Sequence, residues 1–416
     1  MSTVFPASAA DGFVDIAAIM TASAAHSILP SLSAEERQHS EAAAALIRER
    51  LERAGGWLSF EEFMQLALYA PGLGYYSAGS VKLGAGGDFV TAPEISDLFS
   101  CCVAWQCAQV LRETGGEILE FGAGTGRMAS VILPSLAELG VLPARYAILE
   151  VSADLADRQR ERIARLPREL RDRVIWLDRL PATPLVGCML ANEVLDALPV
   201  HRFVMRAGSL RELGVRPAGA GFAWAERPAS AAPDAAFSAA ALELLAQLEG
   251  RLPEGYVSEI GLQLAPWIAG VGACLHRGML LILDYGLPCA HYYHPQRADG
   301  TLRCHFKQRA HDDPFINIGV QDITAWVDFT RVAQSALAAG LEVGGFATQA
   351  AFLLGTGIEA MTAGVTDEVS RVRLAGEARR LLLPGEMGEA VKVMALTREL
   401  EIALDGFAHQ DLRPSL

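Results

Sequence analysis

The stretch EILEFGAGTGRMAS, residues 117–130, decides the fold of this chain. Its first residues are mostly apolar and predict a short strand. The run Gly122–Gly126 predicts a tight turn, because glycine adopts backbone angles that a Cβ atom forbids. The residues that follow, as far as Gly140, predict a helix. A strand, a glycine-rich turn and a helix in this order are typical of an α/β fold that binds a ligand at the turn.

The same alternation continues along the chain. Short apolar runs at 146–152, 173–178, 186–194 and 278–286 predict strands, and the stretch 153–166 predicts a helix between the first two. Strands that alternate with helices form βαβ units and a parallel sheet. Continuous apolar runs are typical of strands that are covered on both faces. We therefore predict an α/β protein with a Rossmann-like core, a mostly parallel sheet with helices on both faces.

Two regions outside this alternation predict additional structure. Before the glycine turn the chain predicts helices, the first capped by Ser33 with Glu36 three residues on, a capping-box spacing. Residues after His201 alternate like hairpins. The predicted organisation is an N-terminal helical cap region with a Gly-rich loop at 1–110, the core at 111–200 and 256–416 with a long polar lid at 287–330, and an inserted hairpin and helix subdomain at 201–255.

Composition narrows the classes of partner. The chain has 416 residues, a formal net charge of -14 and a pI of about 5.2. This balance argues against nucleic acid as a partner, since a duplex-binding surface needs a basic face, and it suits a cationic substrate. No apolar run is long enough to span a bilayer and no leader pattern is present, so we expect a cytoplasmic protein without membrane insertion. The seven cysteines contain no CxxC pair, so a zinc ribbon is not expected.

Acidic residues at the strand ends indicate the kind of ligand. Glu120 directly precedes the glycine turn and suits a ligand with a cationic amino group. Glu150 closes the next strand, where a carboxylate takes the hydroxyls of a ribose. Asp178 closes the third strand, where it could meet an adenine amino group. S-adenosylmethionine (SAM) carries all three groups. A nicotinamide cofactor is the alternative, but its G-x-G-x-x-G fingerprint fails at Arg127.

Several longer motifs follow one another across most of the chain: GYYS (74–77), GDFVTAPEISDLF (87–99), EFGAGTG (120–126), LEVS (149–152), ANEVLDALPVHRF (191–203), SEIG (258–261), LDYG (283–286) and DITAWVDFT (322–330). In sequence and in order they resemble the motifs of one family, the MidA-like SAM-dependent methyltransferases. The family includes the mitochondrial assembly-factor methyltransferases of respiratory complex I. The segment 291–315 is similar to the bacterial branch.

The resemblance implies an activity and a cofactor site. It implies a SAM-dependent methyltransferase with an arginine-bearing protein as substrate, related to a respiratory complex as in the mitochondrial members. The segment 74–94 is expected to close over the cofactor. The candidate cofactor-binding residues are Glu120, Gly122, Gly124, Gly126, Glu150, Val151, Asp178, Tyr76, Asp88, Thr91 and Glu94.

Four polar residues are candidates for the chemistry. Asn192, Glu193 and Asp196 follow the fourth predicted strand, and Glu259 precedes a glycine in a short apolar run. The guanidinium of arginine stays protonated, with a pKa above about 12. A carboxylate that localises its charge and accepts a proton would allow a nitrogen to attack a methyl group. The alternative is that these acids only cap turns.

Other interpretations stay open at this point. Four histidines lie close together in sequence, at positions 291, 294, 305 and 311. They could be metal ligands, a general base or part of a polar lid. We predict no metal site, because their spacing is not a zinc motif. Intact cofactor motifs indicate binding and not turnover. The chain could therefore be an assembly factor that binds SAM without catalysis, or, on the turn alone, a nicotinamide-dependent oxidoreductase.

Overall fold

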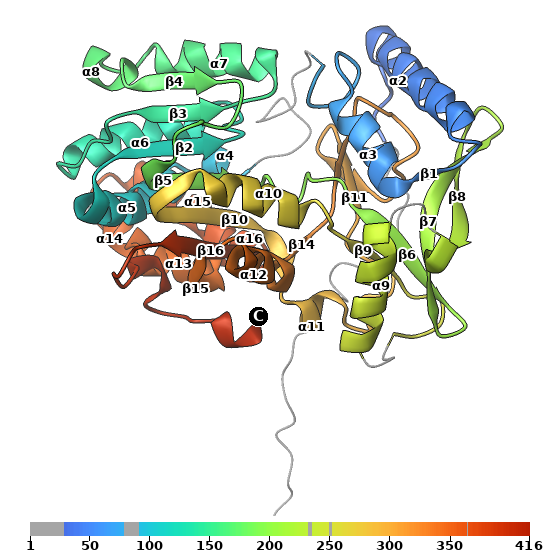
Figure 1. The fold of residues 1–416 in the computed structure, drawn as a ribbon. Helices are drawn as coiled ribbons and strands as arrows, with labels where there is room; N and C mark the ends of the chain where they lie inside the picture. The colour runs from blue at the N-terminus through green and yellow to red at the C-terminus, as the bar shows by residue number, and fades with distance from the viewer. Residues whose placement is uncertain (1–28, 79–90, 232–234, 249–251, 364) are drawn as a thin grey trace, which may run out of the picture.

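The computed structural model describes residues 29–78, 91–231, 235–248, 252–363 and 365–416. Within these ranges the chain forms a larger α/β core and a smaller second domain that lie side by side (Figure 1). No helix of the described ranges is long and apolar enough to cross a membrane.

The core is built on one large sheet with the strand order β15-β16-β10-β5-β2-β3-β4. Only β16 runs antiparallel to its neighbours, and the short β14 pairs with the end of β10. After β2 the chain forms β3 and β4 on one side of that strand and then β5 on its other side. The order in which strands are added reverses at β2, which is therefore the switch point of the sheet. The strands are β2 (Glu117–Phe121), β3 (Tyr146–Leu149), β4 (Val174–Leu177), β5 (Leu185–Asn192), β10 (Leu275–Leu287), β14 (Val327–Asp328), β15 (Glu342–Thr348) and β16 (Val391–Arg398).

Helices cover both faces of this sheet, as its apolar strands require. In β10 the five side chains from Met279 to Leu283 are all fully buried, alternately against one face and the other. One face is covered by α5 (Asp97–Thr114), α6 (Arg127–Glu138), α7 (Ala153–Ile163), α13 (Gln349–Gly355), α14 (Ile358–Ala363) and α15 (Glu368–Leu382), and the other by α10 (Leu264–Ala273) and α12 (Phe329–Ala338). The predicted Rossmann-like α/β core is confirmed. The short helices α4 (Ala92–Ile95), α8 (Arg168–Arg171) and α16 (Met387–Ala390) complete it.

The second domain is an antiparallel sheet covered by helices. Its strands are β1 (Leu58–Ser59), β6 (His201–Arg206), β7 (Ser209–Ala218), β8 (Gly221–Pro228) and β9 (Val257–Ile260), and its helices are α2 (Ala34–Arg53), α3 (Phe60–Tyr69) and α9 (Ala235–Gln247). The segment predicted as an insertion thus supplies most of the sheet. The N-terminal helices belong to the same domain, because Leu58 of β1 pairs with Val215 of β7. Ser33 and Glu36 form the predicted capping box at the start of α2.

Most of the polar stretch at 287–330, predicted as a lid, is instead built into the second domain, and its last residues form β14 and begin α12 of the core. It contains α11 (Cys289–Tyr292) and a small sheet of β11 (Arg303–Phe306), β12 (Arg309–His311) and β13 (Asp322–Thr324). Cys304 and Ile323 are fully buried in the core that also holds Phe60 and Phe63 of α3. The many polar residues hid a strand pattern in which only every second side chain is apolar.

Candidate functional site

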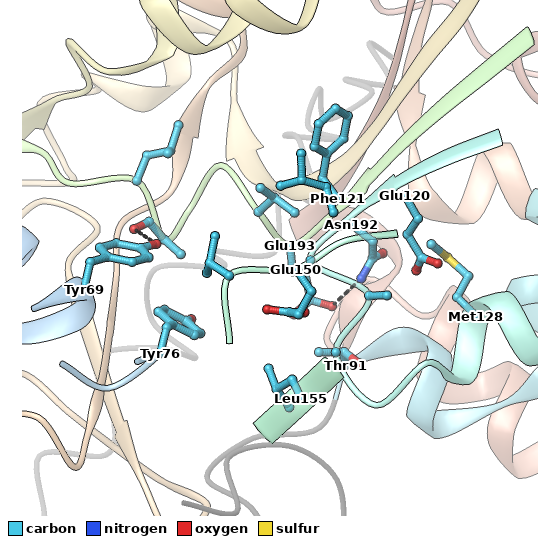
Figure 2. A pocket seen from close by; sticks show the side chains of 18 of the residues that line it. Tyr69, Tyr76, Thr91, Glu120, Phe121, Met128, Glu150, Leu155, Asn192 and Glu193 are labelled. Carbon is cyan, nitrogen blue, oxygen red and sulfur yellow. Dashed lines mark hydrogen bonds between the residues drawn. The ribbon is translucent and has the colours of Figure 1, made fainter. Parts of the chain in front are cut away.

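A cavity of about 630 Å³ opens at the carboxyl edge of the main sheet, where the core meets the second domain. Its walls come from the turns after β2, β3 and β5, from α3 and α4, and from the start of α10. This is the edge at which open α/β sheets bind their ligands. Figure 2 shows side chains from all these strand ends pointing into one space.

The glycine turn forms one wall of the cavity. Gly122, Gly124 and Gly126 have φ angles of 59°, 54° and 76°, in the left-handed region that favours glycine. A Cβ atom on Gly126 would lie 3.2 Å from the Cα of Gln159, so this position is also sterically closed to larger residues. Gly122 and Gly124 therefore present bare backbone to the cavity, beside the side chains of Ala123 and Thr125.

Glu120, the acid before the turn, is only 2% exposed but lines the cavity. The hydroxyl of Tyr146 donates a 2.7 Å hydrogen bond to its Oε2. Burial raises the pKa of Glu120 to about 7. A neighbouring cation would favour the ionised form, so this acid is suited to a positively charged ligand group.

Glu150, which follows β3, is held in place by a network that the sequence did not indicate. Its Oε1 accepts the backbone N–H of Ser152 at 2.9 Å and its Oε2 accepts from Nε2 of Gln159 at 2.9 Å. Gln159 also donates to the carbonyl of Gly124 at 3.0 Å and accepts from the indole of Trp176 at 3.0 Å. This glutamine thus ties the glycine turn to the acid. It lies in the middle of α7, where no local motif marks it.

The structure places Val151 and Asp178, two further candidates for cofactor binding, in different surroundings. Val151 lines the cavity and is 72% exposed, an apolar side chain that a ligand's ring would cover. Asp178 does not line the cavity, so the structure does not bring it together with the other cofactor candidates. Its side chain is 86% exposed and pairs with Arg179 next to it. The strand before it ends at Leu177 on the outer edge of the sheet, and the aspartate turns into solvent.

The segment 74–94 reaches the cavity at both of its ends. Tyr76, Thr91 and Glu94 line the cavity, and Glu94 accepts a hydrogen bond from the hydroxyl of Thr125 in the glycine turn. Asp88, the remaining candidate from this segment, lies outside the described residues.

Glu193 stands on a turn whose backbone is strained. Its φ angle is 51°, in a region that non-glycine residues rarely adopt. Its backbone N–H donates to the carbonyl of Leu283 at 2.8 Å, which continues the pairing of β5 with β10. The side chain lines the cavity, where Oε1 accepts from the backbone N–H of Ala92 and from Asn192 Nδ2, both at 3.4 Å. Asn192 also lines the cavity.

A buried carboxylate behind the turn holds it in this conformation. Oδ2 of Asp284 accepts the backbone N–H groups of Val194, Leu195 and Asp196 at 3.2, 2.8 and 3.3 Å. Asp284 belongs to the LDYG motif, but the sequence alone assigned it no role. Strain of this kind persists where the surroundings over-determine it, and it is found at functional sites.

The acids around this turn influence one another's protonation. Burial raises the pKa of Glu193 to about 8, and the neighbouring carboxylate of Asp196 adds to the shift. Burial also raises the pKa of Asp284 to about 8. Burial therefore favours the protonated form of both groups, and a cation in the cavity beside Glu193 would favour its ionised form.

Two of the four predicted catalytic residues are not at the cavity. Asp196 is buried, does not line the cavity and lies near Asp284 and Asp322, and burial raises its pKa far above the usual range. Glu259 is fully buried in β9, where it accepts from Arg202 at 3.2 Å and from the backbone of Thr301 at 2.8 Å. Its prediction as a catalytic group is wrong, because a carboxylate so paired inside the second domain cannot reach a substrate.

The histidine-rich stretch has no metal cluster in the part of the chain that is described. There, no three His, Cys, Asp or Glu side chains are placed to hold a metal ion. His305 and His311 lie on β11 and β12, and burial lowers the pKa of His305 to about 4. His305 is therefore neutral and part of the small sheet.

Comparison with known proteins identifies the family of the chain that carries this cavity. Residues 102–347 match the model of a family described as "S-adenosyl-L-methionine-dependent methyltransferase". A Burkholderia thailandensis protein described as a methyl transferase, solved with S-adenosyl-homocysteine bound, is 41% identical and has a TM-score of 0.87, covering 93% of this chain and 100% of that one.

Curated relatives share most of the chain at lower identity. The mitochondrial protein arginine methyltransferase NDUFAF7 of Danio rerio is 29% identical over 84% of this chain and 86% of its own length. The human protein of the same name is 27% identical over 83% and 81%. These findings rule out the nicotinamide-dependent oxidoreductase and confirm the resemblance to the MidA-like proteins. The chain belongs to this family of SAM-dependent methyltransferases.

Proposed function

We propose that this chain transfers a methyl group from SAM to an arginine side chain of a partner protein. The observation that carries the proposal is Glu193, a carboxylate with few close partners on a strained turn in the cavity that the glycine turn lines. The arginine methyltransferase names of the curated relatives support the choice of substrate. The excess of acidic residues also suits a cationic substrate.

The residues of the cavity fit SAM group by group. Gly122 and Gly124 leave backbone without side chains on one wall, and Glu120 suits the cationic amino group. Glu150, oriented by Gln159, suits the ribose hydroxyls. Val151 supplies an apolar surface for adenine. When bound, SAM supplies a methyl group on a sulfonium, ready for attack by a nitrogen lone pair.

Glu193 would prepare that lone pair. Its carboxylate draws the positive charge of the guanidinium toward the nitrogens it faces, and a second nitrogen is then free to attack. The nitrogen that takes the methyl group would also lose a proton, and the second carboxylate oxygen of Glu193, Oε2, would accept it. Asn192 and the N–H of Ala92 orient Oε1, and Asp284 holds the turn. Holding the reactants in line supplies much of the rate.

Other parts of the sequence interpretation stay predictions. We propose a cytoplasmic location, although the curated relatives are named as mitochondrial. We also propose that no nucleic acid is bound and that the partner protein is related to a respiratory complex.

The glycine turn should be required for SAM binding. Replacement of Gly124, at φ 54°, by Val places a branched side chain in a disfavoured backbone region at the cavity wall. We expect Gly124→Val to abolish SAM binding in a calorimetric titration while the far-UV circular dichroism stays unchanged. The matched control is Gly140→Val, because Gly140 has a φ of 68° with no atom near its would-be Cβ and lies at the far end of α6. Equal affinity in both variants would contradict the assignment.

Glu150 should contribute to SAM affinity and Asp178 should not. We expect Glu150→Ala to weaken SAM binding by about 1.5–3 kcal/mol, the scale of charged hydrogen bonds. Asp178→Ala serves as the control, since this acid also follows a core strand but faces solvent. Both are measured by calorimetry. If the two variants lose the same affinity, Glu150 only caps the start of α7.

Glu193 should be needed for transfer and not for SAM binding. Glu193→Gln keeps the shape of the side chain and loses the charge. We expect transfer of radiolabelled methyl groups into extract lacking the enzyme to fall by about 10²-fold or more, the range of general-base catalysis, with SAM affinity retained. Glu359→Gln, on the exposed side of α14, is the control. Full transfer by Glu193→Gln would refute the role, and methyl groups found by mass spectrometry only on other residue types would refute the arginine substrate.

Transfer should depend on pH through Glu193. Because the pKa of Glu193 is raised to about 8, its carboxylate is scarce at pH 6 and forms as the pH rises. At saturating SAM we expect kcat/KM for the acceptor to rise about tenfold per pH unit in the acidic range and to level off only above pH 8, as for a base of this pKa in the SAM-bound enzyme. A profile that is flat from pH 6 to 8.5 would mean that no such base is used.

A further inference from the structure

The cavity extends well beyond the residues assigned to SAM. On one side of Glu193 lie the glycine turn, Glu120 and Met128; on the other lie Tyr69 and Tyr76 (Figure 2). Both tyrosines come from the second domain, at the end of α3 and in the turn that follows it. Glu193 is thus placed between a cofactor side and an aromatic side.

The two tyrosines form a continuous aromatic wall. Their ring centroids are 5.4 Å apart and their planes differ by 24°, so the rings are stacked. Both side chains line the cavity and are only partly buried. Each ring uses one face in this stack, and Tyr75 packs against Tyr76 at an angle of 79°, so the pair offers the cavity its remaining ring surface.

The hydroxyl groups of both tyrosines are already used as donors. Tyr69 donates to the carbonyl of Ala197 at 2.9 Å, and Tyr76 donates to Oδ1 of Asp322 at 3.0 Å. Burial raises the pKa of both phenols, with the carboxylate of Asp322 as the next cause, so both stay neutral. The wall therefore carries no charge of its own, but carboxylates stand behind it.

This arrangement suits one kind of side chain. Aromatic ring faces attract a cation, and arginine above all, because its planar guanidinium stacks on a ring while its edge pairs with a carboxylate. A hydrogen bond from Tyr76 to the carboxylate of Asp322 makes the ring more electron-rich and fixes its angle. A lysine ammonium lacks both the plane and the paired donors.

We propose that Tyr69 and Tyr76 form the receptor for the acceptor arginine and select it over lysine, with Asp322 as the residue that positions Tyr76. The proposal rests on the arginine methyltransferase function proposed above. The second domain would thus determine the substrate, and the core would hold the cofactor.

Binding of a short peptide tests the receptor without turnover. The probe is acetyl-Gly-Gly-Arg-Gly-Gly-amide, compared with the same peptide carrying Lys, added to full-length protein saturated with S-adenosylhomocysteine and followed by saturation-transfer NMR. We expect wild type to bind the Arg peptide at least tenfold more tightly than the Lys peptide. We expect Tyr76→Leu and Tyr69→Leu to weaken Arg-peptide binding at least tenfold, with S-adenosylhomocysteine affinity unchanged within twofold.

A milder variant and a control separate positioning from folding. Tyr76→Phe keeps the ring and loses the bond to Asp322, so we expect a three- to tenfold loss, seen in KM for the peptide more than in kcat. Tyr256→Phe, buried away from the cavity in the second domain, should change neither constant. Melting curves identify any variant that fails to fold, and in that case Tyr76→Phe decides.

The outcomes distinguish the receptor from the function. Unchanged Arg-peptide binding in folded Tyr69 and Tyr76 variants, equal binding of the Lys peptide, or no binding of the Arg peptide by wild type would each overturn the receptor. If wild type still produces methylarginine in extract, that failure leaves the proposed function standing. If the methyl groups appear on other residue types, the proposed function itself fails.

Discussion

The carboxylate of Asp284 is the interaction on which the site depends. It accepts three successive backbone N–H groups at the end of β5, where the chain leaves the core for the second domain. Buried N–H groups without partners are costly, so this one side chain fixes the path of the turn. The strained backbone of Glu193 follows from that path. The same turn is joined to the second domain, because the carbonyl of Asp196 accepts the N–H of Ala325.

The acidic side chains of the cavity also couple the charge of a bound ligand to the free energy of unfolding. The pKa of Glu120 is raised to about 7 and that of Glu193 to about 8. The folded protein therefore holds protons that the unfolded chain has released between about pH 4.5 and 8, and these groups make folding less favourable as pH rises through that window. A cationic ligand in the cavity offsets the loss by favouring the ionised acids. Binding of a cationic ligand is thus coupled to the release of protons from these acidic side chains.

Local sequence patterns were sufficient for the core and for part of the site. The strand, glycine turn and helix at 117–140 can be recognised because each uses a short-range signal, and the acids at the strand ends follow from the edge they share. Gln159 and Tyr69 could not be found, because each lies on a helix, and only tertiary packing brings Gln159 to Glu150 and Tyr69 to the cavity. Glu259 was wrongly predicted to be catalytic for the same reason. The local sequence around this carboxylate is the same whether the side chain faces a cavity or pairs with Arg202. The stretch 287–330 looked like a lid because its polar residues outnumber the alternate apolar ones that pack inside.

The second domain is assembled from stretches that are far apart in the chain. Residues 58–59 pair with β7, and β13, more than a hundred residues later, contributes Ile323 to the same core as α3. During synthesis the N-terminal helices leave the ribosome first, with Phe60, Phe63 and Met64 lacking the partners that bury them. Those apolar faces are fully covered only when the chain has been made as far as residue 325, by which time five strands of the core have also been made. The core and the second domain are therefore completed together during synthesis. Neither domain can be obtained alone by truncating the chain at one end.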